Sequence, residues 1–498
     1  MNGRLSGGVL AAVIFIGASA APSIGGASDA VSHATAYLGG RSIPYTARAG
    51  TITLRDETGR STASMFYTAF TRDGVASLDR PITFFYNGGP GSSSIWLRMG
   101  SFAPLRVQSA NDKPIPNPPF SLIENRYSLI DTTDLVFVDP PNTGFSRLAR
   151  SAQPKEFMGV DQDAAAFSQF IHRFLTERGR WNSPKFLFGE SYGTTRTCVL
   201  VNLLQQEGVQ INGVVLLSPA LNWAINLIND DERIGGGDWT FVTYLPTEAA
   251  TAWYHRKAGT GQTLSAFLNG VEAYAGGQYL HDLAEGSDLD AAQFSSDVAK
   301  LHAYLGLPED YIRRSNLRIP YTRFLQGLLR SQGRMLGRHD ARYTSWDLTP
   351  VEDDPDWDPT DVSIFGAFVA LNMDYLTRTL GYHTSLQYRP IADATQLGAA
   401  WDFRHNGVDP PVNAAPDLAN AMATNPHLLV FTGMGYYDHA TPFFANVYAF
   451  NHLGLVQQLR RNLTFGFYPS GHMLYLNPDA LAAFRSDLGR WYARALSR

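Results

Sequence analysis

The sequence contains a single cysteine, Cys198, among its 498 residues, so no disulfide can form within the chain. It also has no basic cluster, since 40 lysines and arginines stand against 45 acidic residues, for a net charge of −5. This balance argues against nucleic acid as a partner. No apolar run after residue 30 approaches the roughly 18 residues that a membrane-spanning helix needs. Neither an H-E-x-x-H motif nor a cysteine–histidine cluster occurs, so we expect no metal and no organic cofactor.

The N-terminus has the pattern of an export signal. Arg4 precedes an apolar segment, residues 9–18, that is too short to span a bilayer, and residues 18–20 (ASA) are small. This arrangement predicts a secretory signal peptide over residues 1–20, in preference to a buried N-terminal helix. We therefore expect a secreted or periplasmic protein with no stable membrane anchor. With 44% hydrophobic residues, the remaining chain can build a large core without disulfides.

The most informative motif is G-E-S-Y-G at residues 189–193. It follows an apolar run, residues 185–188, and precedes a segment that can be helical, residues 194–206. A strand that ends in G-x-S-x-G and turns into a helix is typical of the nucleophile elbow of α/β-hydrolases. The tight turn requires glycine beside the serine, and the helix N-terminus favours developing negative charge. We therefore predict that Ser191 is a nucleophile and not part of an ordinary surface turn.

The pattern along the chain predicts an α/β-hydrolase fold. Alternating segments between residues 49 and 86 suit an antiparallel hairpin. Helical spacing occurs at residues 160–174 and again near the C-terminus, at about 478–495. Short apolar runs typical of buried strands lie at residues 81–86, 134–139, 185–188, 211–217, 427–431 and 463–468. Such alternation indicates a mostly parallel central sheet with helices on both faces.

A long insertion interrupts this alternation. Residues 223–425 are rich in tryptophan, tyrosine and helical patterns, and we expect them to form a mainly helical cap over the active site. The hydrolase core would then consist of residues 21–222 and 426–498. Within the insertion, residues 347–361 carry seven carboxylates, three prolines and no glycine. That composition does not fit an EF-hand, so we favour a solvated acidic loop over a calcium site.

A nucleophilic serine needs a base and an acid that orients the base. In α/β-hydrolases the order along the chain is Ser, Asp, His. His472 follows directly on the last expected strand, at the edge of a sheet where active sites are built. Asp438 follows the preceding strand after a glycine-containing turn. We predict that His472 is the base and Asp438 its orienting acid, with His439 as a bystander and Cys198 as a buried apolar residue.

The oxyanion of the intermediate needs two backbone N–H donors. One is expected from Tyr192, the residue after the serine. The other is expected from the glycine-rich loop at residues 87–94 (NGGPGSSS), whose backbone can approach a substrate closely. No Gly-Lys-Ser/Thr follows this loop, so it is not a phosphate-binding loop.

Four motifs together resemble the serine carboxypeptidase family (peptidase family S10): NGGPGSSS at 87–94, DPPNTGFS at 139–146, GESYG at 189–193 and GHM at 471–473. The resemblance extends from about residue 50 to the C-terminus, apart from most of the insertion. It implies an exopeptidase that removes C-terminal residues from peptides, with Ser191, Asp438 and His472 as the triad. It further implies that Gly89 and Tyr192 supply the oxyanion N–H groups. Asn87, Gly88 and Glu190 would receive the terminal carboxylate of the substrate.

Glu190 carries a pH expectation with it. A carboxylate can bind another carboxylate only if one of the two is protonated. Binding through Glu190 is therefore lost as pH rises through its pKa, and we expect peptide hydrolysis to fall above mildly acidic pH. An ester without a free carboxylate should not show this fall.

The chain also departs from the family pattern. Family members have a second glutamate that pairs with the acid beside the serine, and Ser101 stands at that place here. The family cysteine of the glycine loop is replaced by Ser92, and the family disulfides are absent, which suggests a bacterial-type, disulfide-free branch. Two alternatives stay open. One is an esterase or acyltransferase that uses the same triad, and the other is a non-catalytic binding protein on a hydrolase scaffold.

Overall fold

The structure is a computed structural model that describes residues 29–109, 111–226, 237–392, 397 and 401–497. The signal peptide expected at residues 1–20 lies outside the described residues. None of the described helices is both long and apolar enough to cross a membrane.

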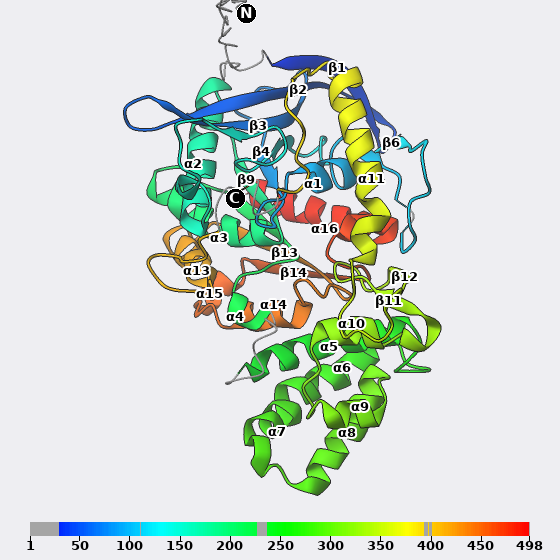
Figure 1. Cartoon of the computed structure of the whole chain (residues 1–498). Coiled ribbons are helices and arrows are strands. Elements are labelled where there is room, and N and C mark those ends of the chain that lie inside the picture. Colours follow the sequence, from blue (N-terminus) through cyan, green and yellow to red (C-terminus); the bar gives the residue numbers. More distant parts are fainter. Residues whose placement is uncertain (1–28, 110, 227–236, 393–396, 398–400, 498) are drawn as a thin grey trace, which may run out of the picture.

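A central sheet organises the molecule (Figure 1). In the described part of the chain it has ten strands, in the order β1-β2-β3-β7-β4-β9-β10-β13-β14, with β8 paired to β3. The strands from β7 to β14 in this order run parallel, whereas β1, β2 and β3 are antiparallel to their neighbours. The strands are β1 (Ala30–Leu38), β2 (Arg41–Arg55), β3 (Ser61–Arg72), β4 (Ile82–Tyr86), β7 (Asp134–Val138), β8 (Arg147–Leu148), β9 (Lys185–Glu190), β10 (Gly213–Leu217), β13 (Leu429–Gly435) and β14 (Leu463–Tyr468).

Helices cover both faces of this sheet (Figure 1). One face carries α2 (Val160–Glu177), α3 (Tyr192–Gln206) and α13 (Ala415–Thr424), and the other carries α1 (Ile95–Gly100), α11 (Pro359–Asp374) and α16 (Pro478–Leu496). Because side chains alternate along a strand, Phe84 and Phe85 belong to different apolar clusters on the two faces. These features confirm the predicted α/β-hydrolase fold with its mostly parallel sheet.

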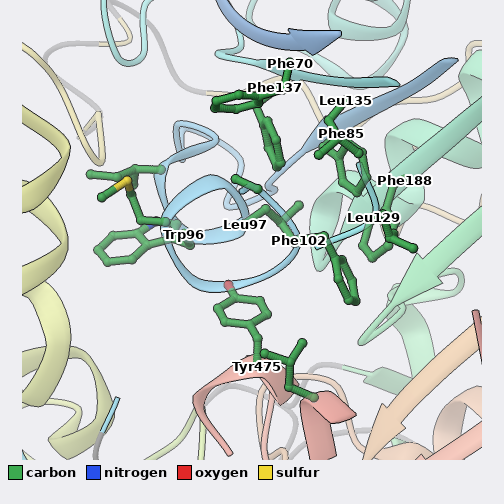
Figure 2. Close-up of a cluster of buried hydrophobic side chains, with 14 of the residues drawn as sticks. Phe70, Phe85, Trp96, Leu97, Phe102, Leu129, Leu135, Phe137, Phe188 and Tyr475 are labelled. Atoms are coloured by element: carbon green, nitrogen blue, oxygen red, sulfur yellow. The ribbon is translucent and has the colours of Figure 1, made fainter. Parts of the chain in front are cut away.

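Aromatic side chains fill the core beside α1 (Figure 2). The ring of Phe85 stacks between those of Phe137 and Phe188, with centroid distances of 4.7 and 4.8 Å. Tyr475, from the segment before α16, enters the same cluster with its phenol oxygen directed toward α1 (Figure 2). The strands and α1 are thereby fixed relative to one another at the level of the glycine-rich loop.

The residues between β10 and β13 form two groups of helices, one in a separate lobe and one packed on the sheet core. Six helices share an apolar cluster of their own and form a separate lobe (Figure 1). They are α5 (Asp238–Tyr254), α6 (Leu264–Tyr274), α7 (Leu280–Glu285), α8 (Ala291–Leu305), α9 (Glu309–Arg314) and α10 (Tyr321–Gly327). In contrast, α11 and α13 pack on the sheet core, although their sequences lie in the segment expected to form one cap. The segment boundaries at 223 and 425 stay a prediction.

Short elements complete the described chain. They are β5 (Leu105–Val107), β6 (Leu122–Glu124), α4 (Trp223–Asn226), β11 (Arg334–Leu336), β12 (Thr344–Trp346), α14 (Phe443–Asn451) and α15 (Gln457–Arg460). The hairpin β11–β12 was not expected in the helical insertion. The loop between its two strands reaches the candidate site.

Candidate active site

Ser191 is the single residue between strand β9, which ends at Glu190, and helix α3, which begins at Tyr192. Its φ is +62°, a left-handed conformation that is strained for a side-chain-bearing residue. The backbone N–H of Ser191 donates to the carbonyl of Leu217 at 3.0 Å, which fixes the turn to the next strand. A Cβ at Gly189 would lie 2.2 Å from the carbonyl oxygen of Gly193, so the turn depends on glycine.

His472 and Asp438 lie in contact. The Nδ1 atom of His472 is 2.8 Å from Oδ2 of Asp438. The other carboxylate oxygen of Asp438 accepts backbone hydrogen bonds from Ala440 and Thr441 at 2.8 and 2.9 Å. Burial alone would raise the pKa of Asp438, but the adjacent His472 and the bonds from Thr441 lower it. Asp438 is therefore held ionised, where it can orient and stabilise an imidazolium.

The loop that carries His472 is fixed by backbone contacts. Its N–H donates to the carbonyl of His339 at 2.6 Å, and its carbonyl accepts from the hydroxyl of Ser218 at 2.7 Å. The N–H of Gly471 donates to Asp340 at 3.1 Å. The position of the imidazole is therefore set from two separate segments of the chain.

A cavity of about 320 Å³ joins most of the predicted site residues. Ser191 and His472 both line it, while Asp438 lies behind His472 and does not. Its polar wall contains Asn87, Gly88, Gly89, Ser92, Glu190, Ser191, Tyr192, Arg338, His339, Asp361, Thr441 and His472. Its apolar wall contains Trp96, Ala220, Trp223, Ile391, Ala440 and Met473. A small molecule or the end of a peptide can therefore reach the serine hydroxyl and the imidazole together.

The glycine-rich loop packs directly on the serine turn. A Cβ at Gly88 would lie 2.4 Å from the backbone nitrogen of Tyr192. Gly89 has a φ of +105°, which favours glycine. In the described part of the chain, neither the N–H of Gly89 nor that of Tyr192 has a hydrogen-bond acceptor. Both residues line the cavity, so these N–H groups are available to an incoming oxygen.

Glu190 is buried in the wall of the same cavity, with 3% of its surface exposed. Its Oε1 accepts hydrogen bonds from the side-chain amide of Asn87 at 2.8 Å and from the hydroxyl of Tyr475 at 3.2 Å. Its Oε2 has no partner among the described residues. Burial raises the pKa of Glu190 to about 8, although the bond from Tyr475 and the charge of His339 act in the opposite direction. At neutral pH Glu190 is therefore largely a neutral acid that can donate a hydrogen bond.

The structure brings Tyr475, and not Ser101, beside Glu190. Ser101 is fully buried, and its hydroxyl donates to the carbonyl of Leu97 within α1. Tyr475 instead contacts α1, since a Cβ at Gly100 would lie 2.5 Å from its ring. Sequence reasoning missed Tyr475. Its only local signal was its place three residues after His472.

His339 was also missed. It lies between β11 and β12, lines the cavity, and its ring centroid is 5.2 Å from that of His472. Its Nδ1 lies 2.7 Å from Oδ2 of Asp358 and 3.0 Å from Oδ1 of Asp361. These two residues belong to the acidic stretch that we expected to be a solvated loop, so for them the expectation was wrong. Asp358 caps the N-terminus of α11, where its carboxylate accepts from Thr360.

His439 and Cys198, which were expected to take no part in catalysis, lie away from the cavity. The ring of His439 is buried, its Nε2 is 3.0 Å from the hydroxyl of Thr251, and it stacks on Phe324 of the helical lobe. Burial lowers the pKa of His439 to about 3, so the ring is neutral. Cys198 is fully buried in α3, and burial raises the pKa of its thiol. Neither side chain lines the cavity.

Comparisons with known proteins identify relatives. Residues 42–225 match the family model described as serine carboxypeptidase. A pheromone-processing carboxypeptidase KEX1 of Cryptococcus gattii is 31% identical over 177 residues, which are 34% of this chain and 24% of the relative. A carboxypeptidase Y homolog of Arthroderma benhamiae is 27% identical over 164 residues, 32% of this chain and 30% of the relative. The alignments thus span 24% and 30% of the length of these curated relatives.

The fold has a relative among solved structures. The crystal structure of Kex1, a prohormone-processing carboxypeptidase from Saccharomyces cerevisiae, superposes with a TM-score of 0.58. The superposition covers 90% of this chain and 91% of the yeast chain, at 17% sequence identity. At this identity the similarity concerns the fold alone. The similarity to serine carboxypeptidases therefore rests on residues 42–225 and on curated relatives that align with about a third of the chain.

Proposed function

We propose that the chain belongs to the serine carboxypeptidase family, whose model matches residues 42–225, and that it hydrolyses the C-terminal bond of peptides as a serine-type carboxypeptidase. One observation carries the proposal beyond the family match. A buried, largely neutral carboxyl group, Glu190, lies in the wall of the cavity that Ser191 lines, and its Oε2 has no hydrogen-bond partner among the described residues. Such a group suits a terminal carboxylate, because it can donate a hydrogen bond to an anion.

In the proposed mechanism, Ser191 Oγ attacks the carbonyl carbon of the last peptide bond while His472 takes its proton. Asp438 stabilises the resulting imidazolium, and the N–H groups of Gly89 and Tyr192 stabilise the oxyanion. His472 then returns the proton to the leaving amine, which departs as the free C-terminal amino acid. Water, activated by His472, releases the acyl group from the serine. In this scheme Asn87, Gly88 and Glu190 hold the substrate carboxylate.

We further propose that the protein is exported, with residues 1–20 as a cleavable signal, and acts in a secreted or periplasmic setting. The pattern of residues 1–20 supports this proposal. The single cysteine supports assignment to a bacterial-type, disulfide-free branch of the family.

The direct test compares a blocked dipeptide that has a free C-terminal carboxylate with its C-terminal amide. We expect kcat/KM to be about 10- to 100-fold higher for the acid, since the amide loses charge-assisted hydrogen bonds. A digest of mixed peptides, followed by mass spectrometry, should show stepwise shortening from the C-terminus. Equal rates for acid and amide, together with rapid cleavage of simple esters, would instead favour an esterase or acyltransferase.

The pH dependence of peptide hydrolysis should report Glu190. Below about pH 8 its neutral form donates to the substrate, and as pH rises through this pKa the ionised form repels it. We therefore expect kcat/KM for a peptide acid to fall through about pH 8, a higher pH than sequence analysis indicated, because Glu190 is deeply buried. Glu190→Gln retains an N–H donor at every pH, so its profile should lack this fall. An ester without a free carboxylate serves as the control, and an identical fall for both substrates would contradict the role of Glu190.

A further inference from the structure

His339 is held in a fixed position beside the proposed catalytic residues. Its backbone carbonyl accepts from the N–H of His472 at 2.6 Å, and its own N–H donates to Asp358 at 2.9 Å. Asp358 in turn caps α11. The imidazole of His339 is therefore anchored both to the loop of His472 and to the N-terminus of a core helix.

Two carboxylates beside this imidazole favour its cationic form. Burial disfavours its charged form, but the charges of Asp361 and Asp358 raise the pKa of His339 well above its ordinary value. The same pairing lowers the pKa of Asp358 to about 2, against the effect of burial. Both carboxylates approach Nδ1, so Nε2 is left without an acceptor in the described part of the chain. A charged N–H group is thus available in the wall of the cavity.

The cavity wall therefore combines a cation with a neutral acid that lacks one partner. The charge of His339 acts on Glu190, and Oε2 of Glu190 is the oxygen without a partner. The wall of one cavity thus contains both a charged and a neutral hydrogen-bond donor for a carboxylate. The position that holds a second glutamate in the family pattern is occupied by Ser101, whose hydroxyl is bonded within α1 and is absent from the cavity.

We infer that His339, charged through its contacts with Asp358 and Asp361, is a specificity-determining residue that binds the free C-terminal carboxylate of the substrate. This inference rests on the proposed carboxypeptidase function. The site that binds the substrate carboxylate would then combine one cation, His339, with one acid, Glu190, where the family pattern has two acids. Among the described residues, the cavity wall around His339 also contains the titratable or charged groups Glu190, His472 and Arg338.

The first test removes the charge of His339 and measures the preference for acid over amide. For His339→Gln we expect kcat/KM for the peptide acid to fall about tenfold or more, mainly through KM, with a much smaller change for the amide. His339→Lys keeps a positive charge and should recover part of the preference.

His405 provides a matched control. It is likewise held between two carboxylates, those of Asp161 and Asp417, at 2.5 and 2.7 Å, but it lies outside the cavity. His405→Gln should leave the ratio of acid to amide cleavage unchanged, even if it lowers stability. A fall in that ratio in both variants would mean a general structural effect and would overturn the inference.

The second test uses pH in a Glu190→Gln background, where residue 190 no longer titrates. The preference for the peptide acid should then be lost as pH rises through the pKa of His339, because His339 is charged below that pKa and neutral above it. Adding Asp361→Asn removes one of the charges that raise this pKa, so the loss should move to lower pH. No movement would contradict the inference.

Two further outcomes are separable. If the wild-type protein shows no preference for the acid, the proposed function and this inference both fail. If the wild type prefers the acid and His339→Gln keeps that preference, only the inference fails.

The donor atoms of His339, Asp358 and Asp361 also lie within 4.8 Å of one another, close enough for a cation. Loss of peptide hydrolysis on dialysis against EDTA, restored by a divalent metal, would therefore overturn the anchor role as well.

Discussion

Replacing Ser191 with alanine should lower kcat for peptide hydrolysis by about a million-fold, the size of effect that follows removal of the serine from a Ser-His-Asp triad. The remaining activity would come from binding and from the oxyanion N–H groups. The folded state should persist, because Ser191→Ala leaves a residue of similar conformational preference at φ +62°. Single-turnover and steady-state assays on peptide acids would measure the change.

A control variant tests whether the thiol of Cys198 contributes to hydrolysis. Cys198→Ala should retain peptide hydrolysis and labelling by a fluorophosphonate probe, since the thiol is fully buried and its pKa is raised by burial. Labelling of the wild type should be lost in Ser191→Ala. A wild-type sample that folds but does not react with the probe would instead favour a non-catalytic binding protein.

The largest expected loss of stability comes from Asp163→Asn. Asp163 in α2 pairs with Arg196 in α3 through two contacts, at 2.6 and 3.2 Å, and the Arg196 side chain is completely buried. Removing the carboxylate charge leaves the guanidinium without its counter-ion in a region of low dielectric constant. We expect the free energy of unfolding to fall by about 3–5 kcal/mol.

The same pair also supports the site. Arg196 donates from Nη1 to the carbonyl of Asn87 at 2.8 Å, and so connects the glycine-rich loop to α2 and α3. Urea unfolding, followed by circular dichroism, measures the cost. Asp310→Asn is the control, because its partner Arg314 and Asp310 itself are both largely exposed, and loss of such a pair costs no more than about 1 kcal/mol. If Asp163→Asn were equally harmless, the buried pair would not stabilise this part of the fold.

Local patterns in the sequence were sufficient to predict the sheet and the turn that carries Ser191. Strand β9, the glycines around the serine and the start of α3 all depend on neighbouring residues, so a short window contains the information. His472 and Asp438 could be selected because each lies in the loop that follows an expected strand. Their contact at 2.8 Å is a property of the sheet order, which places the carboxyl ends of β13 and β14 together.

Tyr475 and His339 could not be found in this way. Each reaches Glu190 or His472 through packing of segments that are distant along the chain, and neither belongs to a motif. Asp358 had a usable signal, since it directly precedes Pro359 at the start of a helical segment, the position of an N-cap. The packing of α11 and α13 on the sheet core could not be predicted either, because helical spacing does not reveal which surface a helix covers.

The reactivity of Cys198 reports local unfolding of the core around α3. The thiol lies in α3, the helix that begins directly after the proposed nucleophile, and a modifying reagent cannot reach it while that helix stays packed. The rate at which a chromogenic thiol reagent reacts therefore measures how often this part of the core unfolds locally. Since no other sulfhydryl competes for the reagent, every modified molecule records an excursion of the same helix.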